Sequence, residues 1–178
     1  MSDADGHRRP SLVMRGAGIL ESVAMVLMVA LVLSIFYSVV AREVFKLSVP
    51  WAEEVAAGLL AWSVMLGAAA AWGQRRHIVI DVLLRRIALG ARVWISVVIE
   101  CGALLLFYVI ARGAWLMMFA SANNTTTALG ISFTWLYLAL LIGTVAMILF
   151  SLVYLVSLIR NGKAVIGQTE TKSEWTTS

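Results

Sequence analysis

Four long apolar runs constrain this chain more than any other feature. They cover about 19–41, 52–72, 93–120 and 131–159. As α-helices, all four reach the roughly 20 apolar residues that a bilayer crossing needs. Trp51 and Trp72 lie 21 residues apart at the two ends of the second run. That spacing is about 31 Å of helix, and tryptophan prefers the headgroup level. We therefore expect an all-α membrane protein with four transmembrane helices.

The composition agrees with a chain surrounded by lipid. Hydrophobic residues make up 61% of the 178 positions and charged residues 13%, about half the charge that is usual in a soluble domain. The lone Cys101 and two histidines give no disulfide framework, metal-ligand spacing or paired haem ligands. No nucleophile with a neighbouring base and no glycine-rich phosphate loop is visible. We expect no cofactor, no metal, no enzymatic activity and no nucleic-acid partner.

The distribution of Lys and Arg predicts the orientation in the membrane. Three lie in the first 18 residues, five between 73 and 92, and three from Arg160 onward, against two in the connection that follows the first run. Basic residues accumulate in cytoplasmic loops. This predicts a cytoplasmic segment over 1–18, a four-helix membrane domain over 19–160 and a flexible cytoplasmic tail over 161–178. A multi-pass membrane protein with both termini cytoplasmic follows.

The basic start of the chain also allows a secretory or twin-arginine export signal. Arg8 and Arg9 are adjacent, but the apolar run that follows has about 23 residues. The apolar region of a signal peptide has about 7–15, so we favour a retained first helix.

The connection between the second and third spans has a helical pattern of its own. His77, Asp81 and Arg85 recur every four residues among apolar ones over about 77–89. A stretch of this kind can lie in the membrane interface with its apolar side down. We expect an interfacial amphipathic helix there, too short to span the bilayer.

Small residues recur every four positions on the first two spans. Small side chains let helix backbones approach closely in lipid. These faces pack either within the four-helix unit or onto a separate membrane subunit, and the sequence leaves both open. The residues are Ala30, Ser34 and Ser38 on one span, and Ser63, Gly67 and Ala71 on the other.

Charged residues at or inside the spans are the remaining candidates. Glu53 and Glu54 with Arg42 could form a cation or proton site, but we favour an interfacial salt bridge and helix cap, because water reaches them. Glu100 and Arg112 are embedded, and an intramembrane charge is a functional hypothesis by default. For Glu100 we keep two readings, a coupling or partner contact and a hydrogen bond inside the bundle. Glu21 resembles the membrane glutamate of small multidrug exporters, yet its shallow position favours simple interfacial placement.

A longer string of residues resembles a known family. It combines Pro50-Trp51-Ala52-Glu53-Glu54 with Arg76-His77-Ile78 and Asp81, and it also includes Arg42, Phe45, Trp62 and Gly67. This string is similar to the signature region of the small permease subunit, DctQ type, of tripartite ATP-independent periplasmic (TRAP) transporters. The four spans and the length of the chain also resemble that family.

The resemblance implies a subunit of a bacterial inner membrane that pairs with a large permease and a periplasmic substrate-binding protein. In that family, uptake is secondary transport (symport) of organic acids, and the small subunit braces the large one as a scaffold. Trp51, Glu53, Glu54, His77 and Asp81 would then be structural or interface residues and not substrate ligands. A self-sufficient small exporter and the membrane anchor of a respiratory enzyme remain as alternatives.

Overall fold

The computed structural model describes residues 9–74 and 89–174, with side-chain surroundings for 13–74 and 93–160. Four helices make up nearly all of this part of the chain. Helix α1 covers Arg9–Glu43, α2 Pro50–Gly73, α4 Leu89–Ala120 and α5 Thr134–Glu174. Each contains an apolar stretch long enough to cross a membrane, from the 24 residues of Pro50–Gly73 to the 31 of Val13–Glu43. This confirms the expected all-α membrane fold with four candidate spans.

The ends of the helices follow from local chemistry. Pro50 occupies the start of α2, where its fixed φ suits the first turn and its missing N–H costs no hydrogen bond. Helix α1 ends at Glu43. Three residues later Lys46 takes a left-handed φ of 54°, which lets Leu47 N–H donate back to Ala41 O at 3.0 Å. Gly130, with φ of 67°, supplies a second reversal between α4 and α5, a conformation that glycine adopts without steric cost.

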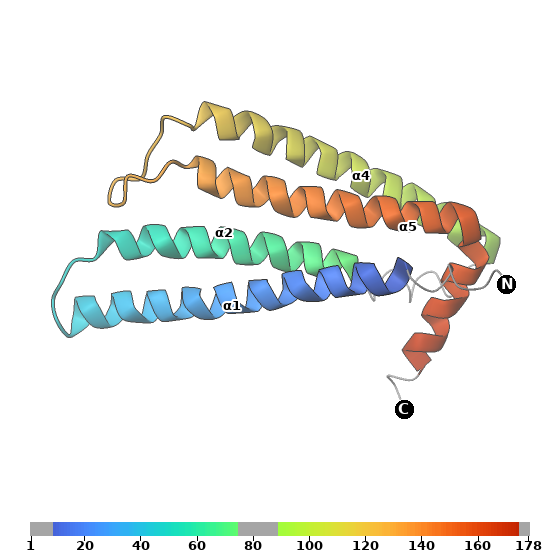
Figure 1. The fold of residues 1–178 in the computed structure, drawn as a ribbon, viewed down its shortest axis with the longest axis horizontal. Helices are drawn as coiled ribbons and strands as arrows, with labels where there is room; N and C mark the ends of the chain where they lie inside the picture. Colours follow the sequence, from blue (N-terminus) through green and yellow to red (C-terminus); the bar gives the residue numbers. More distant parts are fainter. Residues whose placement is uncertain (1–8, 75–88, 175–178) are drawn as a thin grey trace.

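The helices lie side by side in the order α1, α2, α5, α4 (Figure 1). The contacts between helices fall mainly on the pairs α1–α2, α2–α5 and α5–α4. In the described part of the chain, α1 and α4 therefore each have one main neighbour. Both short connections, 44–49 and 121–133, lie at one end of this layer, which we call the loop end. The start of α1 and the end of α5 lie at the other, which we call the terminal end.

The core lies where α2, α4 and α5 come together. Ala69, Phe107 and Met147 form a buried apolar cluster, with Met65 and Trp72 packed against it. Trp72 meets the ring of Phe107 edge to face, with centroids 4.9 Å apart and planes at 85°, a favoured geometry for an aromatic pair. Because α4 reaches α2 through this pair, the central cluster joins three helices, and Leu20 of α1 packs against it from the side.

The helices extend beyond the predicted membrane domain of 19–160. Helix α1 begins at Arg9, within the predicted cytoplasmic segment 1–18, and α5 continues to Glu174, within the predicted tail 161–178. The cytoplasmic location of both segments and the flexibility of the tail stay predictions. The last part of α5 turns away from the direction of the layer (Figure 1). Extending an existing helix costs little, because each added residue gains one hydrogen bond. The predicted amphipathic helix over 77–89 falls almost entirely outside the described residues.

Candidate functional site

At the loop end, an ion pair joins the first two helices. Arg42 in the last turn of α1 donates from Nη2 to Glu53 Oε1 in the first turn of α2, at 2.7 Å. Both side chains are more than half exposed. An exposed pair of this kind contributes about 0–1 kcal/mol. Its main effect is to fix the relative position of two helix ends.

Glu54, the next residue, makes a different set of contacts. The backbone N–H groups of Ala128 and Leu129 each donate to its carboxylate at 2.8 Å, one to each oxygen. The Thr127 hydroxyl adds a longer bond of 3.3 Å. The loop itself is closed by a bridge between Thr125 and Ser132. Glu54 therefore ties the start of α2 to the connection between α4 and α5, and the two adjacent carboxylates act separately.

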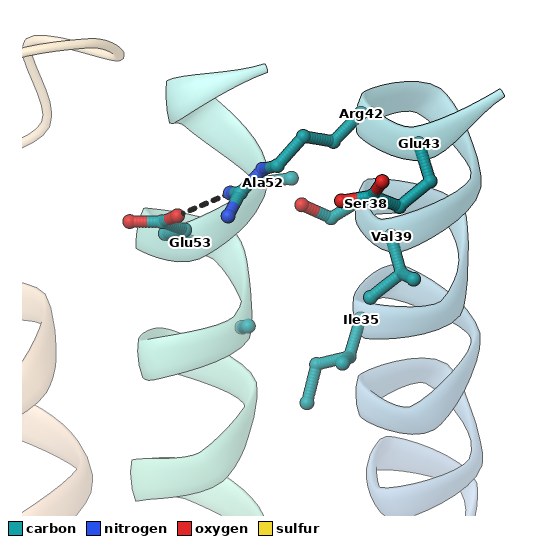
Figure 2. A pocket seen from close by; sticks show the side chains of 8 residues that line it. Ile35, Ser38, Val39, Arg42, Glu43, Ala52 and Glu53 are labelled. Atoms are coloured by element: carbon teal, nitrogen blue, oxygen red, sulfur yellow. Dashed lines mark hydrogen bonds and ion pairs between the residues drawn. The ribbon is translucent and has the colours of Figure 1, made fainter. Parts of the chain in front are cut away.

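A shallow groove lies beside the ion pair, between α1 and α2. Its volume is about 250 Å³. Figure 2 shows Arg42 reaching from α1 toward Glu53, with Val39 and Ile35 further along α1. Buried small residues lie at its base, Ser38 from α1 and Ala52 from α2. The groove is thus polar at the loop end and apolar toward the middle of the layer.

A buried polar chain joins three helices nearer the terminal end. Trp72 Nε1–H donates to Ser151 Oγ at 3.0 Å, and the Ser151 hydroxyl donates to Glu100 Oε1. Glu100 is 2% exposed and Ser151 is fully buried. These residues come from α2, α5 and α4, the three helices of the core. A separate hydrogen bond joins α1 to the end of α2. Gln74, the residue that follows α2, donates from Nε2 to Glu21 Oε2 of α1 at 2.6 Å.

The small residues on α2 face neighbours within the chain. Ser63 is buried and bonds its own helix at Leu60 O, and Ala71 is half-buried. A Cβ built on Gly67 would lie 3.8 Å from Ala24 Cβ of α1, an ordinary van der Waals contact. Tighter approaches lie elsewhere. A Cβ on Gly143 of α5 would meet Met65 Cβ at 2.9 Å and the Met65 backbone oxygen at 3.0 Å, and a Cβ on Gly73 would meet the Phe150 ring at 2.9 Å.

The other predicted residues are more dispersed. Trp51 is 40% exposed, and its ring centroid lies 5.8 Å from that of Tyr37 at the loop end. Arg112 is exposed on α4. His77 and Asp81 lie outside the described residues. Reasoning from sequence missed Ser151, Trp72 as a hydrogen-bond donor, and the backbone of 128–129, because no spacing in the sequence signals these long-range partners.

Among the residues that the structure describes, no three His, Cys, Asp or Glu side chains gather to hold a metal ion. The described residues show three other features. Polar contacts join the ends of helices at the loop end, and a buried polar chain crosses the core. The two outer helices, α1 and α4, expose large apolar side chains such as Phe36 and Leu105.

Comparison with known proteins agrees with this architecture. Residues 31–161 match the family described as tripartite ATP-independent periplasmic transporters, DctQ component. A protein of Haemophilus influenzae, provisionally named a TRAP transporter small permease protein, is 24% identical over 105 residues. That alignment covers 59% of this chain and 65% of the relative, so the chain spans just under two thirds of the length of this curated relative. The family match covers most of the chain and all four candidate spans in whole or in part, and the chain belongs to the DctQ family, the small membrane component of TRAP transporters.

Proposed function

We propose that this chain is the small permease subunit that braces a large permease in a tripartite transporter. In this proposal the large subunit carries the substrate and ion sites. A periplasmic binding protein delivers an organic acid, and uptake is symport driven by an ion gradient. The chain performs no catalysis of its own, and membership in a transporter family supports this assignment. Its contribution is a rigid membrane surface against which the large subunit moves.

The observation that carries the proposal is the open edge of the helix layer. Within residues 9–74 and 89–174, helix α1 has one main neighbour, and its Leu33 and Phe36 are more than 60% exposed. On α4, Leu105 and Trp94 are also more than 60% exposed. Association between helices in lipid depends on packing and not on hydrophobic exclusion. An open layer with two free edges provides packing surface for a larger partner, whereas a closed bundle would provide less.

The interior contacts support the rigidity that a brace requires. The Trp72–Ser151–Glu100 chain joins α2, α5 and α4. The Arg42–Glu53 pair and the Gln74–Glu21 bond join α1 to α2 near opposite ends of that pair. The helices are therefore joined at several positions along their axes, so the layer can act as one rigid unit.

We also propose that the chain lies in the inner membrane with both termini in the cytoplasm. Both connections at the loop end, including the loop held by Glu54, would then face the periplasm. This side is where a periplasmic binding protein would approach the assembled transporter. The scarcity of Lys and Arg in these connections supports the assignment.

Copurification and transport together test the proposal. A tagged chain is expressed together with a large TRAP permease from the same organism, extracted in mild detergent and purified by the tag. We expect the large subunit to be retained, and uptake of an organic acid into vesicles to require both chains and the binding protein. The chain purified and reconstituted alone should give no uptake. Solute movement by the chain alone, or failure to retain any large membrane partner, would overturn the proposal.

A further inference from the structure

The groove between α1 and α2 is large enough for part of a small molecule. Its volume of about 250 Å³ lies below the roughly 300–1,000 Å³ of pockets that enclose a whole small molecule. It is open along one side and lies in the last turns of one candidate span and the first turns of the next. A groove in this place suits one end of a long molecule whose remainder lies in the membrane.

The polarity of the groove changes along its length. Arg42, Glu43 and Glu53 surround the loop end, where the spans reach the membrane surface. Val39 and Ile35 lie about one and two helical turns deeper on the same side of α1. This arrangement complements an amphiphile with a charged head and an apolar tail.

The charges in the groove have a specific order. One guanidinium lies among two carboxylates, and the Arg42–Glu53 contact uses Nη2 alone. A guanidinium has five N–H donors and a carboxylate about four acceptor sites. Both groups therefore retain capacity for a ligand. Glu43 lies 3.7 Å from Lys46 Nζ, so the four charged groups in and beside the groove sum to zero and favour a zwitterion over an anion. Glu54 does not line the groove, because its carboxylate is bound to the backbone of 128–129.

We propose that this groove binds the headgroup of phosphatidylethanolamine. The phosphate accepts hydrogen bonds from Arg42, the ammonium donates to the carboxylates of Glu53 and Glu43, and an acyl chain lies along Val39 and Ile35. Phosphatidylcholine has the same net charge, but its quaternary ammonium has no N–H to donate. Phosphatidylglycerol has no cation for the carboxylates. The groove therefore distinguishes phosphatidylglycerol by its missing cation, and phosphatidylcholine by the missing N–H donors on its ammonium.

Native mass spectrometry of the purified full chain tests this assignment. The chain is delipidated in detergent and mixed with equal amounts of dioleoyl phosphatidylethanolamine, phosphatidylcholine and phosphatidylglycerol. We expect one phosphatidylethanolamine per chain to survive at collision energies that remove the others, with at least about a threefold preference. Soluble phosphoethanolamine should not displace it, because the headgroup alone lacks the apolar contacts.

Variants locate the bound lipid in the groove. Arg42→Gln should weaken retention of phosphatidylethanolamine by at least about tenfold, since charge-assisted bonds to phosphate are the strongest in the set. Glu53→Gln should reduce the preference over phosphatidylcholine without removing it, because Glu43 remains as a carboxylate acceptor for the ammonium N–H groups. Arg112→Gln, which removes an exposed arginine on α4 outside the groove, should change nothing. Helical circular dichroism of each variant shows whether it is folded.

Several results would overturn the proposal. These are equal retention of the three lipids, preference for phosphatidylglycerol, or an Arg42→Gln variant that is folded and retains phosphatidylethanolamine as before. Displacement by free phosphoethanolamine would indicate a soluble phosphate ligand. Loss of the lipid from the complex with the large permease would indicate that the groove is a subunit interface.

Discussion

Adjacent residues with the same side chain have separate roles in this protein. Glu53 bonds Arg42 and Glu54 bonds the backbone of 128–129, because successive positions on a helix point about 100° apart. A similar division applies to embedded charges. Arg112 is exposed on α4, whereas Glu100 is buried and accepts from Ser151. The sequence therefore identifies charged candidates, but their partners depend on which faces pack together.

The first prediction at this scale concerns the acceptor role of Glu100. Glu100→Leu removes the acceptor for the Ser151 hydroxyl. We expect the free energy of unfolding to fall by about 0.5–2 kcal/mol, the range found for hydrogen bonds between membrane helices. Glu100→Gln keeps an acceptor oxygen and should lose much less. Thermal unfolding in detergent, followed by circular dichroism, measures both variants.

Cys101→Ala provides the matched control, because it alters the neighbouring position on α4 that faces outward. The effects of Glu100→Leu and Ser151→Ala should also be less than additive, since each removes the same bond. Equal destabilisation by the Gln and Leu variants, or full additivity, would contradict the hydrogen-bond role. Of the two readings that the sequence left open for Glu100, the contact with Ser151 favours the one inside the bundle.

Among the elements, α2 and α5 approach each other closely at Gly143. The small-residue spacing on α2 drew attention to Ser63, Gly67 and Ala71, yet Gly67 has only an ordinary contact with α1. The close approach involves Gly143 of α5, against the Met65 backbone. A spacing rule finds faces where small residues repeat, and Gly143 approaches a large residue whose position depends on the fold. The existence of four spans was predictable from apolar length, but this pairing was not.

The glycines of α5 and α4 therefore provide a matched pair of variants. Gly143→Ala places a Cβ about 3 Å from the Met65 backbone oxygen, so we expect destabilisation of about 1–3 kcal/mol from overpacking. Gly113→Ala in α4 meets nothing within 4 Å. There the gain in helix propensity should leave stability unchanged or raised by up to about 1 kcal/mol. Thermal unfolding of the two variants side by side measures the difference. Equal effects would show that α2 and α5 do not approach as described.

On the scale of the whole molecule, the layer brings its two short connections together at one end. The order α1, α2, α5, α4 places the first and last parts of the chain at the opposite end. The apolar lengths and the even number of spans predict this sharing of ends. They do not predict which helices are neighbours, because lipid-facing and helix-facing residues are similarly apolar. The Glu54 contacts with the second connection depend on that order.

The orientation of the layer decides which compartment each of its ends faces. In a Cys101→Ala background, Thr127→Cys marks the loop end and Thr171→Cys the last part of α5. With eleven Lys and Arg on the terminal side against two on the other, the positive-inside rule places the loop end outside. A membrane-impermeant maleimide added to intact spheroplasts should label Thr127→Cys and leave Thr171→Cys unlabelled until the cells are lysed. The reverse pattern would place the loop held by Glu54 in the cytoplasm, where a periplasmic binding protein cannot reach it.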